Sequence, residues 1–405
     1  MSAPLQGMRV FDLSRILAGP TATQILGDLG ADVIKIERPG QGDDTRKWGP
    51  PFVTDADGRN TSESGYYLAV NRNKRSVTLD IAKPEGQEIA KRLIAKSDIF
   101  VENFKVGDMA KYNLAYDQIK YDFPRLIYCS ITGFGQTGPY AARAGYDFLA
   151  QGMGGIMSVT GHPSTPPVKI GVAATDIITG IYATTAILAA LHHRTASGQG
   201  QYIDMSLLDT QVSYLANIGL HYLTSGEVPG RLGNEHPNIV PYSVVACSDG
   251  FFILAVGNDS QFEKFCTFAG VADWAADPRF ATNPARVQNR VVLYDMINKL
   301  TATQPQKYWT DGLEALGVPC GPVNNVDQVF ADPQVLHRDM KISMPYPLAA
   351  SGQVDLIGSP IKLSDTPVDY RLAPPICGQD TDTVLREMLY FSDHDLAALR
   401  AKGVI

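Results

Sequence analysis

The sequence has few cysteines, and they are not placed in pairs. Its 405 residues include five, namely Cys129, Cys247, Cys266, Cys320 and Cys377. An odd number without C-x-x-C spacing argues against a zinc site and against a disulfide framework. The opening stretch MSAPLQGMRVFDL has neither the pattern of a signal peptide nor that of a transit peptide. We therefore expect a cytoplasmic protein without a metal site.

Long apolar runs and a strong charge of one sign are also missing. The uncharged run Ile177–Leu191 is shorter than the ~20 residues that a membrane-spanning helix needs. Lys and Arg number 35 against 42 Asp and Glu, a net charge of −7, which argues against nucleic acid or a membrane surface as a partner. Hydrophobic residues make up 44% and charged residues 19%, as in ordinary globular proteins. At roughly 150 residues per domain, the length predicts two or three domains.

The N-terminal part alternates between strand-like and helix-like segments. Met8–Leu13 is predicted as a buried strand, Thr21–Leu29 as a helix and Asp32–Ile36 as a second strand. The alternation continues through the strands Ser76–Ile81, Asp98–Glu102 and Arg125–Thr132 and the helix Lys83–Ala95. This pattern predicts an α/β fold with a parallel sheet, in which ligands bind at the carboxyl ends of the strands.

The character of the sequence changes towards its middle. Gly152–Gly161 is predicted as a glycine-rich loop and Asp176–His193 as a buried apolar helix. A hairpin is predicted over Tyr242–Val256, followed by helices at Gln261–Ala269, Arg286–Thr301 and Gln306–Leu316, and a last helix at Asp380–Met388. We assign 226–330 to a smaller α+β domain.

Some motifs carry little weight by themselves. Gly133, Gly135 and Gly138 match G-x-G-x-x-G, but Pro139 follows and no acidic residue stands about 20 positions on, so a nicotinamide site is disfavoured. A tight glycine loop that lets the backbone approach another ligand fits better. Arg38 follows the second strand, where a surface arginine and a phosphate ligand are both open interpretations. G-x-S-x-G, P-loop and H-E-x-x-H motifs are missing, which disfavours hydrolases, NTPases and zinc proteases.

Asp176, at the start of the apolar helix, has two interpretations. Aspartate at this place is most often a helix cap. A carboxylate kept ionised by the helix N–H groups in an apolar pocket can instead act as a covalent nucleophile towards an acyl group. His236 lies in a polar loop, GNEHPNIVPY, where a histidine is usually just exposed.

Taken together, longer strings of the sequence resemble the class III CoA-transferases. They include DLSRILAGP, GADVIKIERPGQGDDTR, NRNKRS, LDIAKPEG, SITGFGQTGP, AGYD, GVAATDIITG and HPNIVPYS, and they cover nearly the whole chain. The family also contains formyl-CoA transferase, carnitine CoA-transferase and α-methylacyl-CoA racemase. GDDTRKWGPPF and FADPQVLHRDM suggest the succinyl-CoA-dependent dicarboxylate branch, the type of succinate–hydroxymethylglutarate (glutarate) CoA-transferase.

The resemblance implies a catalytic nucleophile, Asp176, and a set of CoA-binding positions. These positions are Leu17, Ala18, Arg38, Leu79, Asp80, Ile81, Ala82, Asn103, Phe104, Lys105, Lys111, Ala144, Tyr146 and Asp147. Arg72 and Arg75 are further candidates for cations that face the CoA phosphates. GNEHPNIVPYS stands where formyl-CoA transferase has a longer glycine-rich loop, which makes His236 a candidate for a substrate loop and oxalate an unlikely substrate.

The resemblance also implies a mechanism and an assembly. CoA passes from succinyl-CoA to a dicarboxylic acid through an aspartyl anhydride and an aspartyl–CoA thioester, with coenzyme A as co-substrate and with neither metal nor nicotinamide. Gly133, Gly135 and Gly138 are candidates for the oxyanion site, and Gly152, Gly154 and Gly155 for a lid. The expected fold is a large doubly wound Rossmann-like domain (1–200 with 331–405), a linker helix (201–225) and the small domain. The family's interlocked rings predict a homodimer.

Tyr146 separates two activities within the family. Racemases of the family have histidine there, thirty residues before the second catalytic aspartate, and Tyr146 and Asp176 have this spacing. A racemase needs acid–base groups that titrate near neutral pH, and a phenol with a typical pKa of about 10 suits that poorly. A transferase is therefore preferred over an acyl-CoA racemase or epimerase. A CoA-binding protein without turnover and a nicotinamide oxidoreductase are further alternatives.

Overall fold

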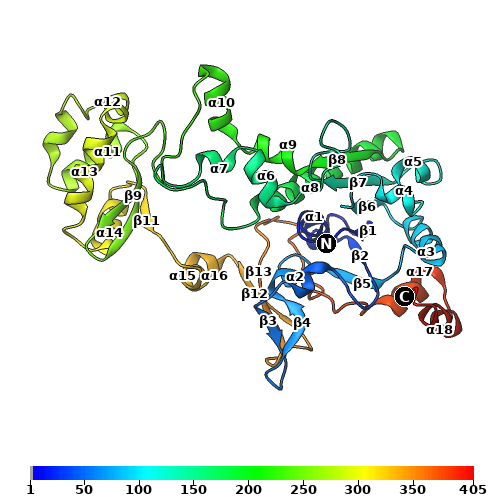
Figure 1. The fold of residues 1–405 in the computed structure, drawn as a ribbon. Coiled ribbons are helices and arrows are strands. Elements are labelled where there is room, and N and C mark those ends of the chain that lie inside the picture. The colour runs from blue at the N-terminus through cyan, green and yellow to red at the C-terminus, as the bar shows by residue number, and fades with distance from the viewer. Residues whose placement is uncertain (1–2) are drawn as a thin grey trace. The chain divides into compact units, whose positions relative to one another are not determined.

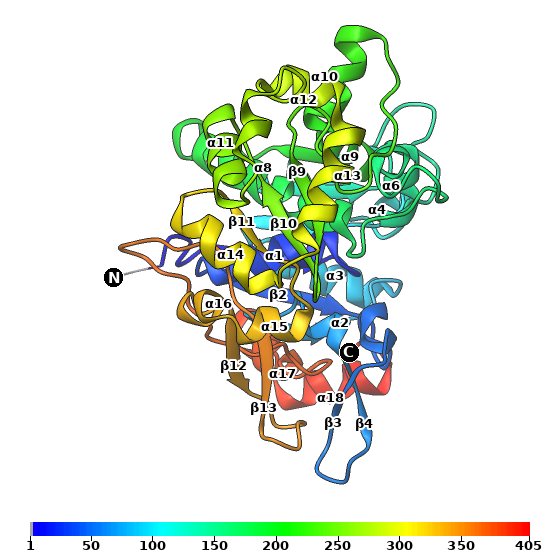
Figure 2. The same cartoon turned by 90° about the vertical axis from the view of Figure 1, so that its left-hand side faces the viewer.

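The computed structural model describes residues 3–405, which form two compact units. The first unit comprises the chain up to Gly155, Ile170–Gly219 and Pro333–Ile405. The second comprises Ile156–Lys169 and Leu220–Asp332, so it contains the whole of 226–330 and, in addition, 156–169. Figures 1 and 2 show the elements of both units, which are described separately below.

The first unit is built on a six-stranded parallel sheet, as the alternation of segments predicts. Its strands are β1 (Arg9–Leu13), β2 (Asp32–Glu37), β5 (Lys74–Thr78), β6 (Ile99–Glu102), β7 (Ile127–Thr132) and β8 (Tyr202–Ser206). Their order is β5-β2-β1-β6-β7-β8, and all neighbours are parallel. This is the doubly wound order, in which the strand order reverses between β1 and β6.

Helices cover both faces of this sheet. Val10 packs with α1 (Ala18–Asp28) and α8 (Ala174–Ser197), whereas its neighbour Phe11 packs with α3 (Pro84–Ile94), α17 (Thr381–Leu389) and α18 (Asp393–Ala401). Successive strand residues point to opposite faces, so β1 is buried on both sides. α8 can approach α1 closely because residue 180 is a glycine. A Cβ at Gly180 would lie only 2.6 Å from the carbonyl oxygen of Ala18. This contact brings the first turns of the two helices together.

Smaller elements complete the first unit. They are η1 (Asp44–Lys47), β3 (Phe52–Thr54), β4 (Asn60–Ser64), α2 (Gly65–Leu68), α4 (Asp108–Lys111), α5 (Tyr116–Ile119), α6 (Asp147–Met153), α9 (Leu207–Ser213), α16 (Pro333–His337), β12 (Lys341–Pro345) and β13 (Gln353–Ile357). The pairs β3–β4 and β12–β13 are antiparallel hairpins.

Two predictions about this region are corrected. The segment 201–225 is not one linker helix: it holds β8 at the sheet edge, α9 and α10 (Ala216–Ser225). Its first residues pair with β7, and this long-range pairing makes them the edge strand of the sheet. The predicted loop Gly152–Gly161 instead includes the end of α6 and the short helix α7 (Ile156–Val159), because the apolar residues between its glycines favour helical turns.

The second unit has a three-stranded antiparallel sheet with helices against it. The predicted hairpin is β9 (Tyr242–Cys247) and β10 (Gly250–Ala255), and β11 (Cys320–Pro322) adds a third strand. The helices are α11 (Asp259–Phe268), η2 (Ala272–Ala276), α12 (Asn283–Gln288), α13 (Arg290–Thr301), α14 (Gln306–Ala315) and α15 (Val326–Ala331). Phe252, Phe262, Phe265 and Trp309 lie in its core.

α8 is the one helix within residues 3–405 that is long and apolar enough to cross a membrane by length and composition alone. Half of its apolar window is buried inside the protein. Because buried core helices pass the same test, this finding is weak evidence for a membrane span. One face of α8 packs against α1, but Ile181, Tyr182 and Leu188 are exposed, which corrects the expectation of a fully buried helix.

Candidate active site

The candidate site lies where the strand order reverses. The loop after β1 contains Arg15, Ile16 and Leu17, and the loop after β6 contains Asn103, Phe104 and Lys105. Neighbouring connections leave the sheet in opposite directions at this point, so a crevice opens at the carboxyl ends of the strands. Two cavities occupy it.

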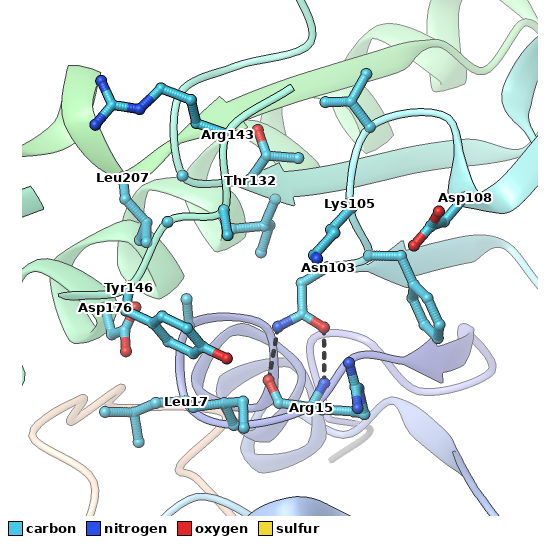
Figure 3. Close-up of a pocket in the computed structure, with 18 of the residues that line it drawn as sticks. Arg15, Leu17, Asn103, Lys105, Asp108, Thr132, Arg143, Tyr146, Asp176 and Leu207 are labelled. Atoms are coloured by element: carbon cyan, nitrogen blue, oxygen red, sulfur yellow. Dashed lines mark hydrogen bonds between the residues drawn. The ribbon is translucent and has the colours of Figure 1, made fainter. Parts of the chain in front are cut away.

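The first, the Asp176 cavity, has a volume of about 260 Å³. Figure 3 shows Asp176 and Tyr146 on one side of it and Asn103, Lys105 and Arg15 on the other. The predicted residues that line it are Leu17, Ala18, Asn103, Phe104, Lys105, Gly133, Ala144, Tyr146 and Asp176, together with Arg15, Ile16, Thr132, Arg143 and Leu207, among others. The fold therefore gathers segments from five distant parts of the chain around one carboxylate.

Asp176 is buried in the first turn of α8, where 8% of its surface is exposed. Burial and the nearby carboxylate of Asp147 raise the pKa of Asp176 to about 7. Within residues 3–405 the structure records no ion pair for this side chain. The Asp176 carboxylate is thus held in a state that binds a proton more tightly than an ordinary aspartate does.

The start of α8 corrects the expectation that helix N–H groups keep Asp176 ionised. Those groups are bonded to another side chain: Oδ1 of Asp147 accepts from the backbone N–H of Thr175 at 2.9 Å and of Asp176 at 3.2 Å. Asp147 is held in turn by Nε2 of Gln151, which donates to its Oδ2 at 2.6 Å. The helix dipole therefore stabilises Asp147, and the carboxylate of Asp176 stays free of these bonds.

The second cavity, the Arg38 cavity, adjoins the first and has a volume of about 220 Å³. Arg15, Asp44 and Phe104 line both cavities. The predicted residues Arg38, Leu79, Asp80, Ile81 and Ala82 line the second, with Gln41 and Tyr112. Because they share these three side chains, the two cavities are neighbours.

Other predicted cations lie elsewhere. Lys111 pairs with Asp108 at 2.6 Å and lines neither of the two cavities. Arg72 makes two bonds to Asp28, at 2.9 and 2.6 Å. Arg75 pairs with Asp32 at 2.7 Å and Glu387 at 3.0 Å. The expectation that Arg72 and Arg75 face CoA phosphates is wrong, because both guanidinium groups hold structural carboxylates instead.

The predicted glycines differ in position. A Cβ on Gly133 would lie 2.5 Å from Cα of Gly145, so these two backbones need glycine to pass each other beside the Asp176 cavity. Gly135 donates its N–H to Oγ1 of Thr132 at 3.0 Å, and neither it nor Gly138 lines the Asp176 cavity. Gly152 lies in α6, and a Cβ on Gly154 would lie 2.3 Å from Cγ of Gln211. Neither Gly152, Gly154 nor Gly155 lines this cavity, and a lid role for them stays a prediction.

His236 lies in the second unit. Its Nδ1 accepts the backbone N–H of Asn238 at 3.1 Å, and its ring meets that of Tyr242 edge-on at 5.4 Å. These contacts hold the ring in its own loop, and its role in substrate binding stays a prediction.

Sequence reasoning missed Tyr66 and Arg143. Burial and the charges of Asp176 and Asp147 raise the pKa of Tyr66, which places this phenol near the candidate nucleophile. Trp48 packs edge-on against it at 5.2 Å. Arg143 lines the Asp176 cavity and stacks on Phe134 and Tyr140. Tyr66 has no local sequence signal, whereas Arg143 directly precedes the predicted position Ala144 and could have been found from it.

In the part of the chain that the structure describes, no group of three His, Cys, Asp or Glu side chains lies close enough together to hold a metal ion. The site is therefore characterised by one buried carboxylate, two adjoining cavities and the arginines around them.

Comparison with known proteins agrees with this geometry. The model of CoA-transferase family III matches residues 5–381. The chain belongs to this family. It is 50% identical to succinate–glutarate CoA-transferase of Agrobacterium fabrum over 95% of this chain and 96% of that one. It is 42% identical to succinyl-CoA:glutarate CoA-transferase of Homo sapiens over 99% of this chain and 90% of that one.

Two solved structures have a similar fold. A CAIB/BAIF family protein from Brucella suis superposes with a TM-score of 0.85 at 48% identity. The match covers 96% of this chain and 100% of that one. Rv3272 from Mycobacterium tuberculosis superposes with a TM-score of 0.82 at 27% identity, covering 94% of this chain and 98% of that one. The mixed α/β fold with a central parallel sheet is thus shared with these two proteins.

Proposed function

We propose that this family III CoA-transferase moves CoA from succinyl-CoA to a dicarboxylic acid and that Asp176 is its nucleophile. The observation that carries the proposal is a buried carboxylate without a cation, set in a cavity that continues to Arg38. The names of the relatives support succinate and glutarate as the type of acid that is exchanged.

The Arg38 cavity supports CoA rather than a dinucleotide as the ligand. In a dinucleotide site the acid that ends the second strand binds a ribose hydroxyl. Here that residue is Glu37, and both of its oxygens are occupied: Oε1 accepts from Arg46 and Ser76, and Oε2 from Arg46 and the N–H of Asp43. Arg38, one residue on, is available to phosphate, because within residues 3–405 its guanidinium bonds only to Gln41, at 3.1 Å.

The proposed reaction solves the problem that a free carboxylate is a poor electrophile. Asp176 attacks the thioester carbonyl of succinyl-CoA, and CoA thiolate leaves, forming an aspartyl–succinyl anhydride. The thiolate attacks the aspartyl carbonyl, which releases succinate and leaves CoA on Asp176 as a thioester. The acceptor carboxylate then attacks this thioester and displaces the thiolate, and a second anhydride forms between Asp176 and the acceptor. The thiolate attacks the acceptor's carbonyl carbon in this anhydride. Acyl-CoA leaves, and Asp176 is regenerated.

The environment of Asp176 supports these steps. A carboxylate with a pKa of about 7 is more basic than an ordinary one, and it is still ionised in about half of the molecules at neutral pH. The first N–H groups of α1 have no side-chain cap, and Leu17 and Ala18 line the same cavity. Such N–H groups stabilise negative charge on a reacting carbonyl oxygen. Of the predicted glycines, Gly133 lines the same cavity and stays a candidate for the oxyanion site, whereas Gly135 and Gly138 do not line it.

The same geometry bears on the racemase alternative. A racemase needs two acid–base groups on opposite faces of the acyl carbon. Tyr146 is 65% exposed and lies on the same side of the cavity as Asp176 (Figure 3), so the two side chains do not face each other across an acyl carbon. We therefore prefer the transferase.

We also propose a homodimer of cytoplasmic location. α8, α9 and the residue that caps α9 expose large apolar side chains, each more than a third accessible, namely Ile181, Tyr182, Leu188, Val212 and Tyr214. Apolar patches of this kind usually mark a protein–protein interface. A second copy of the chain is the partner that the family resemblance implies.

The test is exchange of CoA between acids. Wild type and Asp176→Ala are mixed with succinyl-CoA and a panel of dicarboxylates, and CoA esters are measured by mass spectrometry. We expect new acyl-CoA species from the wild type only, with CoA binding by calorimetry retained in the variant. New esters from Asp176→Ala at the wild-type rate would contradict the assignment of the nucleophile, and epimerised methylacyl-CoA without transfer would favour the racemase.

A further inference from the structure

The turn that follows β1 has a strained backbone. Ile16 has φ of +71°, in the left-handed region. β-branched residues rarely adopt this region, because their Cβ substituents crowd the backbone. The structure therefore holds Ile16 in a conformation that an isolated chain would leave, and the contacts that hold it should be identifiable.

Asn103 makes the strongest of these contacts. Its Oδ1 accepts the backbone N–H of Arg15 at 2.9 Å, and its Nδ2 donates to the carbonyl oxygen of Arg15 at 2.7 Å (Figure 3). One amide side chain thus bonds to both the backbone N–H and the carbonyl oxygen of Arg15, the residue before Ile16. Because Asn103 follows β6 and Arg15 follows β1, this clamp ties together the two loops that part where the strand order reverses.

Two further groups support the turn from other elements. Oδ1 of Asp43 accepts the N–H of Ile16 at 3.3 Å. Nζ of Lys35 donates to the carbonyl oxygen of Ser14 at 3.0 Å. Lys35 and Asp43 form a buried ion pair with each other, which fixes the two groups that bond to the turn. The Asn103 amide closes it from the opposite side.

We propose that Asn103 is a positioning residue for CoA transfer, acting through the Arg15–Ile16 turn that it clamps. The inference rests on the function proposed above. Arg15, Ile16 and Leu17 form one wall of the Asp176 cavity, and Leu17 leads directly into α1. If the clamp opens, Ile16 relaxes to negative φ, and this wall moves relative to the reacting carbonyl.

The resemblance to the family gives Asn103 a different role, contact with CoA. The two roles predict different kinetics. A ligand contact that is lost raises KM for the acyl-CoA, whereas a misplaced cavity wall lowers kcat. The oxygen and one N–H of the Asn103 amide are already used by Arg15, which favours the positioning role.

The test is a double-mutant cycle of Asn103→Ala and Ile16→Gly, assayed with succinyl-CoA and glutarate. We expect Asn103→Ala to lower kcat roughly ten- to hundred-fold, as displacements of about 1 Å do, with KM for succinyl-CoA changed less than about two-fold. In the Ile16→Gly background the same substitution should lower kcat less than about three-fold, because glycine adopts positive φ without steric strain.

Equal loss in both backgrounds, or a raised KM with unchanged kcat, would overturn the proposal. Asn298→Ala is the matched control, because its amide also bridges two backbone groups, the N–H of Ala246 and the carbonyl of Tyr294, within the second unit. It should leave kcat unchanged. Hydrogen exchange gives a readout independent of turnover: Asn103→Ala should speed exchange at the N–H of Arg15. A wild type that forms no new acyl-CoA would refute the proposed function, whereas an active wild type with an active Asn103→Ala would refute the positioning role alone.

Discussion

Asp43 and Asp176 are both buried aspartates of the first unit, yet their surroundings have opposite effects. Burial alone raises the pKa of Asp43, but Nζ of Lys35 at 2.8 Å and the N–H and hydroxyl of Thr45 outweigh burial and lower it to about 2. Asp176 has a second carboxylate as its neighbour instead of a cation, and its pKa rises to about 7. The two sites show how one residue type is made either structural or reactive.

The difference lies in which interactions accompany burial. A buried ion pair with further hydrogen bonds fixes a loop, here the turn after β1, because removing either partner leaves an unpaired charge. A buried carboxylate without a cation destabilises the fold but stays basic and nucleophilic. The protein thus uses the stable pair to support the wall of the cavity that contains the unstable carboxylate.

The largest expected effect comes from breaking the stable pair. Lys35→Met leaves Asp43 buried without its cation and should lower the free energy of unfolding by about 3–5 kcal/mol. Urea denaturation at neutral pH measures this. Lys307→Met is the control, because its pair with Asp311 is exposed on both sides and its loss should leave the free energy of unfolding almost unchanged. A Lys35→Met protein as stable as the wild type would contradict the comparison.

Removing the unpaired carboxylate of Asp176 should instead raise the free energy of unfolding. The pKa of Asp176 rises from 3.8 to about 7 on folding, so the native state binds the proton more tightly than the unfolded state. Stability is therefore lost as pH rises between these two values, and Asp176→Asn should restore up to about 4 kcal/mol at pH 8 and almost none at pH 4. Denaturation at both pH values checks this. A gain of equal size at pH 4 would show that packing, not charge, is responsible.

Glu102 sharpens the comparison, because a raised pKa alone does not make a nucleophile. Burial raises its pKa to about 7, although hydrogen bonds from Ser130 and from the N–H of Phe104 lower it. It lines a separate cavity with Tyr116, Tyr128 and Tyr202. Glu102→Gln keeps the acceptor for Phe104 and should gain about 1–2 kcal/mol at pH 8, again with little change at acid pH. Turnover should fall less than about three-fold, and a loss like that of Asp176→Ala would contradict this assignment.

The smallest effect concerns the neighbour of Asp176. Because the ionised form attacks, kcat/KM should fall as pH drops below about 7, the pKa of Asp176. Asp147→Asn keeps the Oδ1 acceptor for the start of α8 but removes the like charge. The acid limb of the profile should then move to lower pH, by up to about one unit. A limb that stays in place would mean that burial alone sets the pKa of Asp176.

The sequence allowed the frame of this site to be predicted, but not its chemical environment. The parallel sheet follows from alternating apolar strands and amphipathic helices, which are local patterns. Asp176 was identified by resemblance, because an aspartate at a helix start is ordinarily a cap. That Asp147, twenty-nine residues earlier, accepts the N–H of Asp176 depends on how α6 meets α8. No local pattern encodes that contact.

The same limit explains the errors. Arg72 and Arg75 form a basic cluster in the sequence, yet Arg72 bonds Asp28 and Arg75 bonds Asp32, residues more than forty positions away. β8 is a strand because the edge of β7 is available to it. Long-range partners decided both outcomes.

The most direct test of the account follows one oxygen atom. Each complete turnover with a dicarboxylate acceptor labelled with ¹⁸O in its carboxyl groups leaves one acceptor oxygen on the nucleophile, because the second anhydride breaks at the acceptor's carbonyl. After turnover with succinyl-CoA, mass spectrometry of peptides should find ¹⁸O in the carboxylate of Asp176 and none in Asp147, Asp43 or Glu102. Label in another carboxylate, or in none while acyl-CoA is formed, would contradict the account.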